Sequence, residues 1–303
     1  MESPIRYSII IPSRCRPQAL QNCLQAIQHL DYPKDNFEVI VVLDGDKENY
    51  ERLISLSTHT DFSLQVVSQE RAGPSAARNM GARLAKGKYL GFTDDDCLLP
   101  SNWLTQVDSL FAFHPECLLG GQIMPLATVD HCSRASHALL NAVYQFYNDD
   151  PAHSAFFASC HMLMPKSAFD ELQGFDVNFQ TAEDRDFCSR WCSRGWPMVY
   201  NPSLVIHHDQ KDSFISFFRR HFRYGRGGYR FHLKQARQQQ ASFHLAPKKF
   251  YHHLLSVLGN LTFSQKEYRL VFLLLISQLA SLLGFLLQAL SWESPKTPES
   301  GRK

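Results

Sequence analysis

Three consecutive carboxylates, Asp94, Asp95 and Asp96, follow a short apolar run within GFTDDDCLLP at residues 91–100. Carboxylates this close repel one another, which raises their pKa values or frays the preceding strand unless a cation lies among them. Oxygen ligands of this kind favour Mg²⁺ or Mn²⁺, and such an ion keeps positions open for phosphate oxygens. The alternative is a solvated acidic turn or a charge cluster at a helix start, and the triplet alone leaves both open.

Two more polar groups have residue types suited to chemistry. Glu183 and Asp184 lie in TAEDRD at residues 181–186, where a helix is expected to begin. Acids at such a place often only complement the helix dipole, but a carboxylate near a metal can also act as a general base. His207 and His208 follow a short predicted strand. They are either a polar strand end or ligands for a metal or a phosphate.

An arginine precedes the acidic triplet on a predicted helix. Gly73 and Pro74 form a turn, and we predict a helix from the N-cap Ser75 to about Ala85. Arg78 falls in the first turns of this helix, where the helix N-terminus and the guanidinium both attract an anion. The alternative is that Arg78 pairs with a surface acid.

The surrounding sequence alternates strand and helix patterns. Apolar runs predict strands at 7–11, 37–43, 64–67 and 89–93, and periodic apolar positions predict helices at 18–30, 47–57 and 75–85. This alternation predicts an α/β fold with a parallel sheet, and ligands bind beyond the carboxyl ends of such strands. The polar residues after these strand ends are therefore expected at one edge: Pro12, Arg14, Asp44 and the acidic triplet.

Beyond residue 100 the pattern is less regular. We predict helices at 102–113 and 182–194, strands at 118–123, 198–200 and 204–207, and a helix with lid-like loops at 127–156. The 303 residues are 44% hydrophobic and 20% charged, which fits a folded protein rather than a disordered one. Eight cysteines without a CxxC pair are interpreted as reduced thiols, and no signal peptide is recognisable, so we expect the body of the protein in the cytosol.

The C-terminal third combines basic and apolar segments. Ten Lys or Arg and a single acid lie between residues 211 and 249, which predicts an anionic partner: a phosphate, a membrane surface or nucleic acid. A helix from Ser213 would carry phenylalanines on one side and arginines on the other, interrupted at Gly225, Gly227 and Gly228. Residues 270–290 are uncharged and long enough to span a bilayer, although such a helix could also lie in the interface or form an oligomer.

Together these motifs resemble the inverting glycosyltransferases of family 2, which have the GT-A fold. The resemblance rests on YSIIIPSRCRP (7–17), VIVVLDGD (39–46), GPSAARNMGARLAKGKYLGFTDDD (73–96), GFDVNFQTAEDRDFCSRW (174–191) and HHDQKDSFISFFRRHFRYGRGG (207–228). It implies an α/β GT-A fold with a Rossmann-like, mostly parallel sheet flanked by helices, followed by a C-terminal helical segment associated with a membrane. The implied units are a catalytic domain at 1–210 (nucleotide-binding half 1–100, acceptor half 101–210), a basic amphipathic segment at 211–265, a hydrophobic helix at 266–292 and a disordered tail at 293–303.

The resemblance also implies roles for individual residues. Asp184 matches the catalytic base, with Glu183 beside it, and Asp44 matches an acid that contacts the nucleotide base, most often uracil. The residues implied to bind the nucleotide sugar are Pro12, Arg14, Asp44, Arg78, Asp94 and Asp95. Those implied to hold a divalent metal, Mn²⁺ or Mg²⁺, are Asp96, Asp94 and His207.

The implied activity is transfer of one sugar from a nucleotide-diphosphate sugar, most often a UDP-sugar, to a hydroxyl of a lipid-linked or saccharide acceptor. It would proceed with inversion, in cell-envelope glycan or glycolipid synthesis at the cytoplasmic face of the cell membrane. The sequence has no QxxRW motif of processive synthases, which favours single transfer. A nucleotidyltransferase is disfavoured because no GxGxR loop follows the first strand, and a non-catalytic nucleotide-sugar-binding protein stays open. Nucleic acid is not expected, because the arginines alternate with phenylalanines and precede an apolar stretch.

Overall fold

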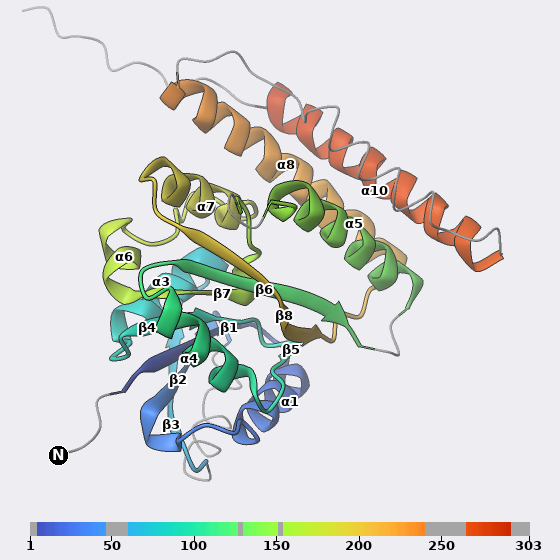
Figure 1. Cartoon of the computed structure of the whole chain (residues 1–303). Coiled ribbons are helices and arrows are strands. Elements are labelled where there is room, and N and C mark those ends of the chain that lie inside the picture. Colours follow the sequence, from blue (N-terminus) through green and yellow to red (C-terminus); the bar gives the residue numbers. More distant parts are fainter. Residues whose placement is uncertain (1–4, 47–59, 127–129, 151–153, 240–264, 292–303) are drawn as a thin grey trace, which may run out of the picture.

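The computed structural model describes residues 5–46, 60–126, 130–150, 154–239 and 265–291. One eight-stranded sheet runs through the molecule in the order β3-β2-β1-β4-β7-β6-β8-β5 (Figure 1). Its strands are β1 (Tyr7–Ser13), β2 (Phe37–Asp44), β3 (Ser63–Gln69), β4 (Tyr89–Phe92), β5 (Cys97–Leu98), β6 (Leu118–Pro125), β7 (Met162–Pro165) and β8 (Met198–His208). The predicted helix at 47–57 and the predicted tail after Trp292 lie outside the described residues.

The first half of the sheet is the predicted parallel unit. β1 pairs in parallel with β2 and with β4, and β2 pairs in parallel with β3. Every residue of β1 and β2 is buried, as expected of strands in a parallel sheet. The crossover helices are α1 (Pro17–Gln28) and α3 (Pro74–Leu84). Because the strands are parallel, their carboxyl ends meet at one edge.

The second half of the sheet is mixed. β7 runs antiparallel to both β4 and β6, while β6 and β8 are parallel. The two short strands predicted at 198–200 and 204–207 form the single strand β8, whose pairing with β6 is irregular between Gly121 and Gln122. The bulge explains why the apolar pattern of the sequence breaks in the middle of one strand. The short strand β5 then pairs antiparallel with the end of β8.

An aromatic cluster joins the two halves. α7 (Glu183–Ser193) carries Phe187, whose ring centroid lies 4.9 Å from that of Phe175. Phe175 in turn lies 5.2 Å from Phe92 of β4, and all three rings are buried. This packing fixes α7 against β4, so the acidic start of the helix lies near the acidic end of the strand.

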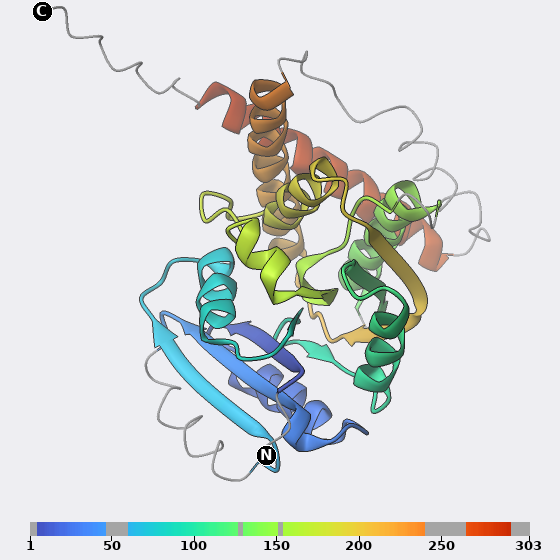
Figure 2. The ribbon, with the colours of Figure 1, turned by 60° about the vertical axis from the view of Figure 1, so that its left-hand side comes forward.

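Three long helices pack together on one side of the sheet: α5 (His131–Asn148), α8 (Phe214–Gln239) and α10 (Gln265–Leu290) (Figures 1 and 2). α4 (Trp103–Phe113), α6 (Lys166–Glu171) and the 3-10 turns η1 (Lys34–Asn36) and η3 (Ser159–His161) complete the described elements. The stretch Tyr268–Leu290 of α10 is long and apolar enough to cross a membrane.

The glycines of α8 do not interrupt it, contrary to the prediction, and the helix is continuous over 26 residues. A Cβ atom on Gly225 would lie 1.9 Å from the carbonyl oxygen of Ser281, and one on Gly227 would lie 2.2 Å from Thr181 Oγ1. These glycines therefore allow α8 to pack closely against α10 and against the residues just before α7.

The start of α3 also differs from the prediction. Gly73, with a φ angle of 95°, is the N-cap of this helix, and it provides no side-chain cap. Ser75 lies inside the helix, where its hydroxyl donates to the Phe179 carbonyl over 3.1 Å. Its hydrogen bond thus ties α3 to the segment before α7 instead of capping the helix.

Candidate active site

The acidic triplet directly follows β4, and each carboxylate has its own partner. Asp94 is 2.6 Å from Arg78 Nη2. Asp95 is buried, accepts a hydrogen bond from Ser13 Oγ over 2.7 Å and lies 2.6 Å from Arg16 Nη2. Burial raises the pKa of Asp95 to about 7, although Arg16 and Ser13 oppose this shift. Repulsion within the triplet is thus relieved by cationic and hydroxyl groups that come from two directions.

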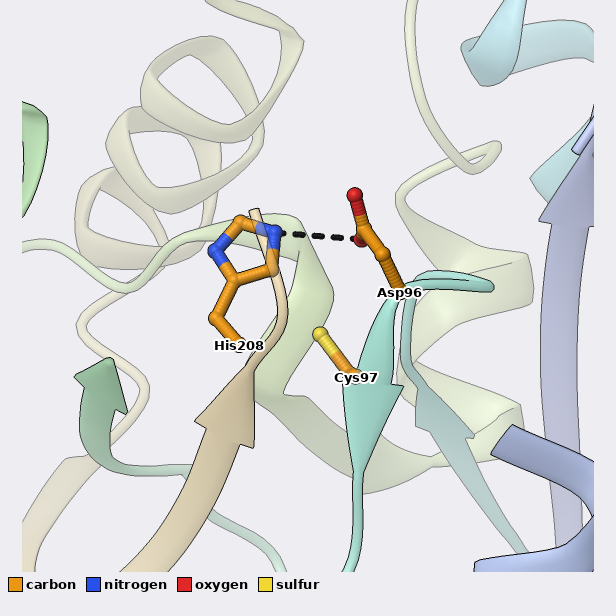
Figure 3. A group of neighbouring side chains, drawn as sticks. All are labelled: Asp96, Cys97 and His208. Atoms are coloured by element: carbon orange, nitrogen blue, oxygen red, sulfur yellow. Dashed lines mark hydrogen bonds and ion pairs between the residues drawn. The ribbon is translucent and has the colours of Figure 1, made fainter. Parts of the chain in front are cut away.

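His208 is the histidine that reaches this triplet (Figure 3). Its Nε2 lies 3.1 Å from Asp96 Oδ1, and the Asp209 amide donates to the Asp96 carbonyl over 2.8 Å. Burial disfavours the imidazolium, but the Cys97 sulfur and the Asp96 carboxylate outweigh it and raise the pKa of His208 to about 9. The same contact with His208 and the guanidinium of Arg16 lower the pKa of Asp96, against the effect of its burial.

The histidine in contact with Asp96 is thus His208, one residue after the His207 that was predicted to bind the metal. Cys97 pairs with His208 and Leu98 with His207 in the β5–β8 register. Successive side chains of a strand point to opposite faces, so only one of two adjacent histidines can face Asp96. The pairing of β8 with the short strand β5 determines which histidine faces Asp96. The sequence gives little indication of β5, because the strand has only two residues.

The donor set of this corner suits a divalent cation. Ligand atoms of Asp96, Cys97 and His208 all lie within 4.8 Å of one another. The carboxylate of Asp96 suits Mn²⁺ or Mg²⁺, the imidazole of His208 suits first-row transition metals and so favours Mn²⁺ of these two, and the thiol of Cys97 favours softer metals. Asp96 and His208 are therefore the donors that fit Mn²⁺. Asp94, also expected as a ligand, lies outside this cluster because its carboxylate pairs with Arg78.

Arg78 connects the triplet to α7. Its guanidinium is buried, with Nη2 2.6 Å from Asp94 and Nη1 3.1 Å from Glu183 Oε1. Burial lowers the pKa of this guanidinium, but the two carboxylates raise it more, so the net shift is upward. Both terminal nitrogens are therefore occupied by acids of the site, and Arg78 holds the strand end and the helix start together.

Asp184 follows Glu183 on α7 and lines the same cavity as Asp94. The helix begins after Ala182, whose φ angle of 70° turns the chain sharply. Asp184 accepts a hydrogen bond from the Arg185 amide over 2.8 Å. Burial and then the neighbouring charge of Glu183 raise the pKa of Asp184 to about 7. A carboxyl group that titrates near neutrality in a cavity has the properties of a general base.

The residues predicted to bind the nucleotide, Pro12, Arg14 and Asp44, line the same cavity. Asp44 is buried at the end of β2 and accepts hydrogen bonds from the Ala72 amide (2.7 Å) and the Gly73 amide (3.0 Å). Its carboxylate thus shapes the turn that leads into α3. Arg14 is exposed at the rim, in the turn after β1.

Arg16 is a site residue that the sequence reasoning missed. It lies two positions after Arg14, contacts Asp96 as well as Asp95, and lines the cavity. A second arginine in the turn after the first strand was the available signal. Proximity to the triplet could not be inferred, because it depends on how this turn folds over the end of β4.

The cavity extends from the acidic edge to the three-helix layer and has a volume of about 1690 Å³. Its far wall is largely apolar and comes from α5, α8 and α10, with Leu139, Leu140, Val143, Phe231, Leu282 and Phe285. Basic side chains also line the cavity, namely Arg185, Arg220 and Arg223.

The sequence matches the model of glycosyl transferase family 2 over residues 8–173, and that of glycosyl transferase family group 2 over residues 92–294. The chain therefore belongs to glycosyltransferase family 2. It is 25% identical to the pre-mycofactocin glycosyltransferase of Mycobacterium tuberculosis, over 72% of this chain and 46% of that protein. It is 32% identical to the glycosyltransferase AglE of Haloferax volcanii, over 38% of each chain. The chain thus aligns with less than half the length of these curated relatives.

Solved structures share the fold. The mannosyltransferase PcManGT from Pyrobaculum calidifontis, in complex with GDP-Man and Mn²⁺, superposes with a TM-score of 0.60 at 18% identity, over 97% of this chain and 79% of that chain. TarS 1–349 of S. aureus superposes with a TM-score of 0.56 at 15% identity, over 93% of this chain and 89% of that chain. TarS is also known in complex with UDP-GlcNAc, with a TM-score of 0.53 at 15% identity, over 89% of this chain and 72% of that chain. The predicted GT-A fold is confirmed.

Proposed function

We propose that this glycosyltransferase moves one sugar from a nucleotide-diphosphate sugar to a hydroxyl of a lipid-linked acceptor, with inversion at the anomeric carbon. The observation that carries the proposal is the salt-bridge chain Asp94–Arg78–Glu183, which joins the end of β4 to the start of α7. Asp184 thereby lines the same cavity as Asp94 and His208. The proposed base, Asp184, and the residues proposed to bind the diphosphate are therefore close to one cavity.

In this mechanism Asp184 accepts the proton of the acceptor hydroxyl as its oxygen attacks the anomeric carbon. The bond to the diphosphate breaks in line, so the configuration inverts. Asp96 and His208 would hold a divalent cation, Mn²⁺ or Mg²⁺, which when bound supplies positive charge for the departing diphosphate. Arg16, beside Asp96, adds a fixed positive charge at the same corner. Asp44, Pro12 and Arg14 are assigned to the nucleotide and Asp94 to its ribose or sugar.

The donor is proposed to be a UDP-sugar, with a GDP-sugar as the competing choice. Structures of similar fold are bound to GDP-Man and to UDP-GlcNAc, so the fold accommodates either base. Asp44 would accept hydrogen bonds from the nucleotide base. In this structure it accepts them from the amides of Ala72 and Gly73.

The acceptor is proposed to be lipid-linked because the cavity continues into an apolar wall. A free saccharide offers hydroxyls that leucine and phenylalanine side chains cannot pair with, whereas a hydrocarbon chain is stabilised by burial there. We assign the reaction to glycolipid or cell-envelope glycan synthesis at the cytoplasmic face of the cell membrane.

Release of nucleoside diphosphate tests this function. The full chain is incubated with a panel of UDP- and GDP-sugars and a lipid extract as acceptor source, with Mn²⁺, with Mg²⁺ and with chelator. Metal-dependent release from one donor is expected, and Asp184→Asn should lower its rate by about 10² to 10⁴, the range for a general base. Asp170→Asn, which changes an exposed aspartate of α6, is the matched control.

Three other results would contradict the proposal. Pyrophosphate release from a nucleoside triphosphate and a sugar phosphate would indicate a nucleotidyltransferase. Donor binding without release, in the presence of the lipid extract, would indicate a binding protein. Retention at the anomeric carbon, seen by proton NMR of the product, would exclude the in-line mechanism.

A further inference from the structure

α10 presents an apolar ridge to the outside of the molecule. The exposed side chains of this ridge are Phe272, Leu275, Leu279, Leu283, Leu287 and Leu290, and Leu282 and Leu286, which are also exposed, lie where the ridge meets the cavity. They follow one another along the helix, whereas Leu273, Leu274, Ser277 and Ala280 on its inner side are buried. An exposed apolar surface of this length marks a contact with a membrane or another apolar partner.

We propose that this ridge lies flat in one leaflet of an anionic membrane, so that α10 enters the leaflet lengthwise and does not cross the bilayer. The inference goes beyond the proposed function, because docking depends on the two helices α8 and α10 and not on the reaction.

The first argument is that α10 cannot be placed without α8. Phe217 of α8 packs with Leu273 and Leu274 of α10, and further along Arg226 Nε donates to Gln288 Oε1 over 2.8 Å. The two helices therefore run side by side in the same direction (Figures 1 and 2).

Backbone-to-backbone contacts hold this pair together. A Cβ atom on Gly284 would lie 1.9 Å from the Phe222 carbonyl oxygen, which is as close as the corresponding approach of Gly225 to Ser281. Contacts of this closeness leave no room for a lipid chain between the helices. Packed helix axes lie about 8 to 10 Å apart, so at any level that α10 takes in a membrane α8 can differ in depth by no more than about that distance.

The second argument is charge. The apolar stretch of α10 has 23 residues, so it measures about 34 Å, enough for the roughly 30 Å hydrocarbon core if it stood upright. In that position the arginines of α8 would lie at the same levels of the hydrocarbon: Arg219, Arg220, Arg223, Arg226 and Arg230. Charged side chains at that depth are costly. The active-site cavity, which both helices line, would also sit inside the bilayer.

A helix pair lying flat resolves both difficulties. The ridge of α10 reaches the acyl chains, and the exposed arginines of the neighbouring helix, Arg219, Arg223 and Arg226, stay at the level of the headgroups. Basic side chains beside an apolar helix face favour anionic lipids. Phe214 and Ile215 at the start of α8 are exposed as well.

Depth measurements distinguish the two placements. In the full chain, the two exposed thiols are removed by Cys15→Ser and Cys192→Ser. Single spin labels are then attached to Leu275→Cys, Leu279→Cys, Leu283→Cys and Leu290→Cys. In vesicles of phosphatidylcholine with phosphatidylglycerol, similar shallow depths at all four positions are expected. A depth that peaks near position 279 and falls toward 290 would show a crossing helix and overturn the proposal.

Flotation with the same vesicles tests the ridge itself. Leu279→Glu with Leu283→Glu should lower the fraction bound at least tenfold, while Phe113→Glu, an equally drastic change of an exposed aromatic on α4, should leave it unchanged. Vesicles of phosphatidylcholine alone should bind the unaltered chain more weakly. Failure of the unaltered chain to float, together with a dimer in sedimentation that Leu283→Glu dissociates, would assign the ridge to a second copy and overturn the proposal. Circular dichroism verifies that each variant is folded.

Discussion

Asp96 has a cationic group on each side, Arg16 from the turn after β1 and His208 from the end of β8. These two groups come from segments almost two hundred residues apart, and they converge on one carboxylate. At the scale of single residues, the role of each acid in the site therefore depends on the cationic group that contacts it. That view separates two neighbouring histidines which the sequence presents as equivalent.

The histidine pair gives a matched test. Loss of a residue that only supports a metal ligand lowers metal affinity roughly tenfold or more. His208→Ala should therefore raise the Mn²⁺ concentration needed for half-maximal activity by at least this factor. His207→Ala should leave it near the unaltered value, because only His208 reaches Asp96. A titration of activity against Mn²⁺ measures both. A larger effect of His207→Ala would contradict the assignment.

The pH dependence of the rate follows from Asp184. Its pKa is raised to about 7, so the carboxyl is protonated and inactive as a base below that pH and ionised above it. We therefore expect kcat/KM to rise about tenfold per pH unit up to about pH 7 and then to level off. The residual activity of Asp184→Asn should lack this rise. If the rise persists in that variant, another group is responsible for it.

At the scale of elements, α8 and α10 depend on glycines that a sequence pattern interprets as helix breakers. Gly225→Ala adds a methyl group where the Ser281 carbonyl lies only 1.9 Å away, so it should destabilise the protein by about 1 to 3 kcal/mol through overpacking. Gly228→Ala is the matched control, because nothing lies within 4 Å of its added Cβ and it should gain about 0.5 to 1 kcal/mol of helix propensity. Thermal unfolding should separate the two variants in opposite directions.

The sequence predicted those helices and strands well that follow from the regular spacing of apolar residues along the chain. β1 to β4 with α1 and α3 follow from alternating apolar runs, and the parallel arrangement places Asp44 and Asp94 at one edge. The same local signals could not reveal the antiparallel β7 between β4 and β6, since strand order depends on contacts distant in sequence. They could not choose between His207 and His208 either, because a shift of one residue reverses every side chain of a strand.

At the scale of the whole molecule, the cavity is assembled from segments that no single motif describes. Asp94 comes from the parallel half, the proposed base Asp184 from α7, and the apolar wall from α5, α8 and α10. The two family models together reach all three parts, because one of them extends to residue 294. The wall comes from the packing of the last helices, and it is the part on which the proposal of a lipid-linked acceptor rests.

Acceptors with increasing alkyl chains test this wall. A buried methylene contributes about 0.8 kcal/mol, or roughly fourfold in binding, so the KM of an alkyl glycoside should fall steeply with chain length until the wall is covered. Leu140→Asn, which puts an amide on the wall, should flatten this dependence while the KM of the nucleotide sugar stays unchanged. Val177→Asn, at an exposed site outside the cavity lining, is the control. A KM that does not respond to chain length would assign the acceptor to soluble saccharides, and the apolar wall would then serve only to pack the helices.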